Sequence, residues 1–158
     1  MIETGENKIS KADGEYEHAV FDALMNFQAI EELLKDCILV SYQILSKTTP
    51  EGVEFHPSKK DIKDIKSRLG LGGLISRFEM VTPYKDICVK LRAATKTRNE
   101  LAHTAAANYL KFPVSSSGAD QILAKASDFN DAAVSANSLF YELSEVFEKI
   151  MEVHGKTV

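Results

Sequence analysis

The chain has 158 residues, of which 44% are hydrophobic and 27% are charged, a size and composition typical of one globular domain with its own core. It has neither an apolar stretch of the ~18 residues that a membrane span needs nor a basic, apolar leader at its start. These features exclude membrane and secreted classes, so we expect a cytoplasmic protein. Cys37 and Cys88 lack CxxC or metal-ligand spacing and are expected to be buried free thiols.

The charges are unevenly distributed along the chain. The net charge of −4 argues against a dedicated nucleic-acid-binding domain. Residues 59–98, however, hold 11 basic and 4 acidic side chains, a net charge of +7, between flanks that carry −7 and −4. This basic segment favours a local anionic partner. Solvated lysines and arginines on exposed helix faces would give the same pattern, so both interpretations stay open.

The first half of the chain predicts two helices. Residues 1–13 are polar and are expected to form a flexible leader, followed by a single domain over 14–158. From about Gly14 to Lys47, apolar residues recur at spacings of three and four, which predicts an amphipathic helix. Ser58, with Asp61 three residues later, predicts the N-cap of a second helix.

The second helix is expected to reach Leu69, where a glycine cluster at residues 70–73 interrupts it. Helix-end or close-packing roles fit these glycines best, and a short helical segment follows at 74–78. Pro83 suits the first turn of a helix that reaches about Tyr109.

A loop is expected over residues 111–118, residues 119–126 are compatible with helix or an extended segment, and a last helix is predicted from Ser127. The apolar period of that helix, near 3.5, suits packing along a neighbouring helix or across a dimer seam. The predicted fold class is all-α, an up-and-down bundle of four or five helices.

The helix predicted over 83–109 carries the residues of greatest chemical interest. At about 100° per residue, one of its faces carries two cations, an amide and an imidazole, with a further lysine on the same side: Arg92, Lys96, Asn99, His103 and Lys85. Cations attract phosphates, an amide can donate or accept a hydrogen bond, and an imidazole can exchange a proton near neutral pH. A solvated polar face would have the same composition.

Arg98 belongs to a different face of that helix. It lies about 140° around the axis from His103, near the centre of the apolar stripe. A guanidinium placed there needs a partner or a water-filled cleft. One interpretation is a structural ion pair with Glu31, Glu32 or Asp36. The other is a place in an intersubunit cleft, where Arg98 would stabilise charge on a phosphate.

The hexapeptide Arg98-Asn99-Glu100-Leu101-Ala102-His103 resembles the Arg-Asn-x-x-x-His motif of the HEPN superfamily of helical, usually dimeric proteins. The order of predicted helices around it is similar as well. The resemblance implies an HEPN-like four- or five-helix bundle that dimerises, so that the motif helices of two subunits line one cleft. It also implies a metal-independent endoribonuclease without a cofactor, in which the RNA 2′-hydroxyl attacks the adjacent phosphate.

On this resemblance, His103 would be the general base or acid, Arg98 would stabilise the phosphate, and Asn99 would orient the imidazole or touch a phosphate oxygen. Helical spacing, not the resemblance, adds Arg92, Lys96 and Lys85 as RNA-binding residues. The partners implied are a second copy of the chain, an RNA substrate, and an antitoxin or other partner protein.

Such an endoribonuclease would act as a toxin or phage-defence effector. Ala105 stands where members paired with a nucleotidyltransferase antitoxin often carry tyrosine, so regulation through that tyrosine is not expected. The alternative function is a non-catalytic helical dimerisation module that binds a protein or nucleic acid.

Overall fold

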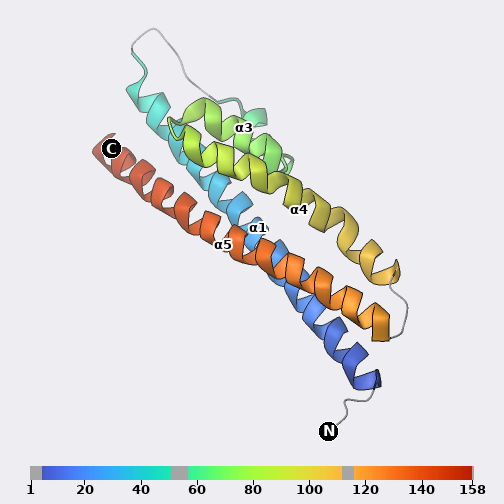
Figure 1. Ribbon diagram of the computed structural model, residues 1–158. Helices are drawn as coiled ribbons and strands as arrows, with labels where there is room; N and C mark the ends of the chain where they lie inside the picture. The colour runs from blue at the N-terminus through green and yellow to red at the C-terminus, as the bar shows by residue number, and fades with distance from the viewer. Residues whose placement is uncertain (1–4, 51–56, 112–115, 158) are drawn as a thin grey trace. The chain divides into compact units, whose positions relative to one another are not determined.

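The computed structural model describes residues 5–50, 57–111 and 116–157. Over these residues the protein is all-α, with five helices and no strand (Figure 1). The helices are α1 (Gly5–Thr48), α2 (Lys59–Ser67), α3 (Leu71–Val81), α4 (Lys85–Lys111) and α5 (Ser116–Thr157). None of the described helices is both long and apolar enough to cross a bilayer. The predicted all-α class is confirmed.

α1 and α5 begin earlier in the chain than predicted. α1 begins at Gly5 instead of about Gly14, so residues 5–13 of the expected leader are helical. α5 begins at Ser116 instead of Ser127, so residues 119–126 are helical as well. Tertiary contacts explain both extensions, because Lys8 Nζ pairs with Asp120 Oδ1 at 2.8 Å and Ala12, Ala119 and Ile122 are buried. Residues 112–115 of the expected loop lie outside the described residues.

Local chemistry sets the start of α2. The Asp61 N–H donates to Ser58 Oγ at 3.0 Å, and the Ser58 N–H donates to Asp61 Oδ2 at 3.2 Å. These two bonds form a capping box and confirm the predicted N-cap. The helix ends at Ser67, short of the predicted Leu69.

α3 and α4 differ from prediction at their starts. Gly70 is the N-cap of α3, so the glycines at 72 and 73 lie in its first turn and the helix exceeds the predicted 74–78 segment. A Cβ added at Gly73 would come within 3.1 Å of the Leu69 side chain, which supports the close-packing role. Pro83 lies before α4 instead of in its first turn, and its carbonyl accepts the Lys85 N–H at 2.9 Å.

The chain divides into two compact units. Unit 1 consists of Met1–Phe27 and Lys96–Ser138, and unit 2 consists of Gln28–Thr95 and Leu139–Val158. α1, α4 and α5 each contribute a segment to both units, whereas α2 and α3 belong to unit 2 alone. The single domain expected over residues 14–158 stays a prediction.

Unit 1 joins segments of three helices. The Tyr16 ring of α1 lies 5.7 Å from the Phe129 ring of α5, measured between centroids, and the Tyr16 hydroxyl donates to the Ala105 carbonyl of α4. Asn26 Nδ2 of α1 donates to the Ala133 carbonyl of α5 at 3.0 Å. These bonds reach backbone carbonyls across helix boundaries, so they fix the position of α1 against α4 and α5 within this unit.

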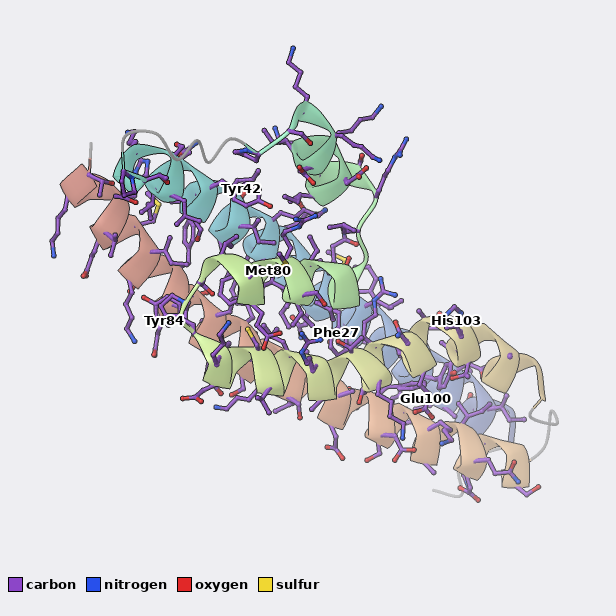
Figure 2. All side chains as sticks on the ribbon, turned by 90° about the horizontal axis from the view of Figure 1, so that it is seen from above. Phe27, Tyr42, Met80, Tyr84, Glu100 and His103 are labelled. Carbon is purple, nitrogen blue, oxygen red and sulfur yellow. The ribbon has the colours of Figure 1, made fainter. Side chains whose placement is uncertain are left out.

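Unit 2 has an apolar core to which all five helices contribute. The largest of its fully buried side chains are Ile30, Leu34, Ile38, Ile65, Leu74, Ile75, Phe78, Leu91 and Leu143. α3 lies alongside the first part of α4 (Figures 1 and 2), and an Arg92–Glu79 ion pair joins the two helices. Cys37 and Cys88 are buried free thiols, as predicted. Burial, reinforced by the neighbouring Asp36 carboxylate, raises the pKa of Cys37 to about 12.

Candidate functional site on helix α4

The Arg98–His103 segment lies in the part of α4 that belongs to unit 1. Leu101, inside the motif, is fully buried and therefore fixes the inward side of this helical stretch. The Tyr16 hydroxyl bonds to the carbonyl of Ala105, two residues after His103. Figure 2 labels Glu100 and His103 on this part of α4. The motif backbone is thus held by a core leucine and by a hydrogen bond from another helix.

The motif side chains divide between two environments. Asn99 and His103 are exposed, whereas Arg98 is half-buried. This division matches the helical arithmetic, which puts Arg98 on the apolar stripe and the other two on an outer face. Arg98 Nη1 donates to Asn99 Oδ1 at 3.4 Å. Among the described residues, His103 takes part in no hydrogen bond or ion pair, so its imidazole is available to an external group.

The ion pair considered for Arg98 with Glu31, Glu32 or Asp36 stays a prediction. Of these carboxylates, Glu32 accepts from Lys35 Nζ at 2.6 Å.

The three cations predicted to bind RNA have different surroundings. Lys96, in unit 1, is exposed. In unit 2, Arg92 pairs with the Glu79 carboxylate, and Lys85 Nζ donates to the Glu79 backbone carbonyl. The hydrogen bond from Arg92 lowers the pKa of the Glu79 carboxyl. A phosphate bound by Arg92 would therefore compete with an ionised partner on α3. The RNA-binding role of these residues stays a prediction.

The motif side chains supply groups that can transfer a proton and bind a phosphate. In the described part of the chain, no group of three or more His, Cys, Asp or Glu side chains could hold a metal ion. An exposed imidazole can accept or donate a proton, and a guanidinium can bind two phosphate oxygens. Within one chain, Arg98 and His103 diverge around the helix axis. Chemistry that uses both groups on one phosphate needs them to converge.

Two pockets lie in unit 2. One, of about 330 Å³, lies between α4 and α5 and includes the Lys90–Glu142 ion pair, whose atoms are 2.5 Å apart. The other, of about 200 Å³, is lined mainly by apolar residues of α1, α3 and α5. Neither of these pockets includes a motif residue, so they do not form part of the candidate site.

Tyr16 is the residue of this region that sequence reasoning missed. Its signal was present, because Ala12, Tyr16, Ala19 and Ala23 are buried at spacings of four, three and four and continue the apolar period of the first helix. Its hydrogen bond to Ala105 joins positions 89 residues apart, and no local pattern indicates such a contact.

Comparison of the chain with protein-family models, curated proteins and solved structures finds no match. The resemblance to the HEPN superfamily therefore stays a prediction from the hexapeptide and from the helix order that the sequence predicts.

Proposed function

We propose that the protein is a metal-independent endoribonuclease of the HEPN type, with Arg98, Asn99 and His103 as its reacting and positioning groups. The observation that carries this proposal is the exposed His103 imidazole. It has no partner among the described residues, and Asn99 is also exposed, one turn earlier on the same face of α4. The backbone beneath them is fixed by buried Leu101, as a site that must hold its geometry requires.

The reaction is a transesterification within the RNA. His103 removes the proton from a 2′-hydroxyl, and the resulting oxygen attacks the adjacent phosphorus. The bond from phosphorus to the 5′-oxygen breaks, and that oxygen takes a proton from the imidazolium form of a His103 side chain. The products are a 2′,3′-cyclic phosphate and a 5′-hydroxyl. Arg98 stabilises the negative charge that develops on the non-bridging oxygens of the pentavalent phosphate.

Two copies of the chain provide the geometry that one copy lacks. Arg98 and His103 lie on different faces of the same helix, about 140° apart. If the α4 helices of two copies face one cleft, Arg98 from one copy can approach a phosphate whose neighbouring 2′-hydroxyl is deprotonated by His103 of the other copy. A homodimer is thus part of the proposal. A toxin or phage-defence effector, controlled by an antitoxin or another partner protein, is the cellular role that fits this activity.

A non-catalytic dimerisation module is the competing function, and it is compatible with the exposure of Asn99 and His103 on α4. That function predicts that His103→Ala has little effect on any property of the isolated protein. It also predicts that Arg98→Ala lowers the free energy of unfolding by about 3–5 kcal/mol if Arg98 sits in a buried ion pair.

The deciding experiment compares wild type with His103→Ala and His18→Ala on several RNAs in EDTA. His18 is a matched control because its side chain is 75% exposed and lies on α1, where it contacts Asp22. We expect wild type and His18→Ala to produce cyclic-phosphate ends at equal rates, and His103→Ala to be slower by about 10²–10⁴-fold. Equal cleavage by all three proteins, or none by wild type on any RNA, would reject the nuclease.

Thermal melts of the same proteins and of Arg98→Ala complete the test. A marginal change for Arg98→Ala would rule out the buried ion pair. Sedimentation of wild type as a monomer at assay concentrations would contradict the dimeric site.

A further inference from the structure

A second cationic surface lies on α2, within unit 2. Lys59, Lys63 and Lys66 follow one another at spacings of four and three and are all exposed, with exposed Lys60 beside them. At about 100° per residue, the first three fall within about 60° of one another around the helix axis. Ile65, which is fully buried, marks the opposite side. Figure 2 shows nitrogen-tipped side chains that extend from this short helix into solvent. We call these four residues the α2 lysine face.

The carboxylates of α2 do not neutralise this face. Asp61 accepts hydrogen bonds from Ser58 and pairs with Arg77 at 3.3 Å. Asp64 lies 3.6 Å from Arg68 Nη1. Residues 59–68 hold five basic and two acidic side chains, a net charge of +3. Among the described residues, none of the four lysine side chains takes part in a hydrogen bond or ion pair, although Lys60 lies near enough to Asp61 to help lower the pKa of that carboxyl. The positive charge is therefore available to an external partner.

We propose that the α2 lysine face binds the phosphate backbone of single-stranded RNA. Charge complementarity supports an anionic, linear partner, because the lysines form a row about 10 Å long at a rise of about 1.5 Å per residue. The ammonium groups are point charges on flexible stems. They suit sequence-independent contacts with phosphates better than the reading of bases. The choice of RNA as the polyanion rests on the proposed nuclease function.

A membrane surface fits α2 less well. A helix that lies in the lipid interface inserts an apolar face beside its basic residues. No large apolar side chain of α2 is exposed, since Ile65 is fully buried and Ile62 is half-buried. The lysine face therefore offers positive charge without an exposed apolar side chain to insert into lipid.

Counterion release gives the expected size of the effect. Each phosphate contact contributes about −0.7 to the slope of log K against log salt concentration for a single strand. Removal of three lysines should therefore flatten the slope by about 2. It should also weaken binding at least about tenfold at low salt.

The experiment measures binding of a labelled oligouridine RNA by fluorescence anisotropy in EDTA, with His103→Ala as the parent protein so that the RNA stays intact. The test variant adds Lys59→Gln, Lys63→Gln and Lys66→Gln, because glutamine preserves helix propensity. The control variant adds three changes at exposed lysines of α1 and α5, Lys47→Gln, Lys149→Gln and Lys156→Gln. Both variants lose the same charge, and circular dichroism checks that both stay folded.

We expect the test variant to show the weaker binding and the flatter salt slope, and the control to change less than about twofold. The proposal would be overturned if both variants lost RNA affinity equally, or if the parent protein did not bind the RNA. Binding of phosphatidylserine vesicles without binding of RNA would also overturn it and would assign the face to lipid. Cleavage by the protein with His103 intact is scored separately. Lysine-dependent binding without cleavage would therefore reject the nuclease and keep the α2 surface.

Discussion

Replacement of Tyr16 by phenylalanine should loosen the α4 segment that carries the motif without disturbing its packing. The substitution removes the hydroxyl that donates to the Ala105 carbonyl. It keeps the ring, which is tilted by 59° against Phe129 at a centroid distance of 5.7 Å. The change therefore tests the hydrogen bond between the Tyr16 hydroxyl and α4 in unit 1.

The expected loss of stability follows from the energy of this hydrogen bond. A buried hydrogen bond contributes about 1 kcal/mol net to the free energy of unfolding, so Tyr16→Phe should increase the unfolded fraction roughly fivefold. Tyr16→Ala also loses the ring and its aromatic contact, and should cost about 3–5 kcal/mol. Urea unfolding followed by circular dichroism measures both values. The m value should stay constant for Tyr16→Phe, because the surface exposed on unfolding hardly changes.

The pH dependence tests the burial of the same hydroxyl. Burial raises the pKa of Tyr16 above its ordinary value of 10.0, so the folded protein retains the phenolic proton longer than the unfolded chain. This contribution to stability is complete below pH 10 and is lost as the pH rises through the folded value. The difference between wild type and Tyr16→Phe should therefore shrink above about pH 10. This account of how α4 is held would be refuted if the free energies of unfolding of wild type and Tyr16→Phe differed by less than about 0.3 kcal/mol at pH 7. It would also be refuted if that difference did not change with pH.

Two further predictions concern unit 2. Ser58→Ala should lower the stability of α2 by about 1 kcal/mol, because the helix loses its N-cap. Faster amide hydrogen exchange in that helix would show the loss, whereas Ser58→Thr should retain most of the cap. Because hydrogen bonds from Ser58 are the main cause of the lowered pKa of Asp61, NMR titration of Ser58→Ala should find that pKa closer to its ordinary value. An unchanged Asp61 titration would contradict the capping box. With its pKa near 12, Cys37 should resist a thiol reagent at pH 8 in a Cys88→Ala background and react fully in urea. Rapid labelling of the native protein would contradict its burial.

The fold class could be predicted because its signals are local. The capping pair of Ser58 and Asp61 lies within one turn, and the apolar period repeats every three or four residues along each long helix. A rotation of about 100° per residue also places Arg98 and His103 on different faces of one helix. The structure agrees, because Arg98 is half-buried and His103 is exposed. Such features need no knowledge of the neighbouring helices.

The extra turns of α1 and α5 could not be predicted in this way. Residues 5–13 have only two apolar side chains, Ile9 and Ala12, and α5 begins with Ser-Ser-Gly, which disfavours a helix. Contacts such as the Lys8–Asp120 ion pair stabilise these segments only after distant parts of the chain meet. Tertiary packing routinely overrides weak local preference.

The sequence by itself determined that this chain is helical and that an arginine, an amide and a histidine share one stretch of helix, since both follow from residue order and a fixed helical pitch. Only the tertiary structure decided which charges are already paired. Arg92 forms an ion pair with Glu79 on another helix, whereas the four lysines of α2 are exposed. Ion pairing across helices depends on distances in space, and sequence spacing does not encode them.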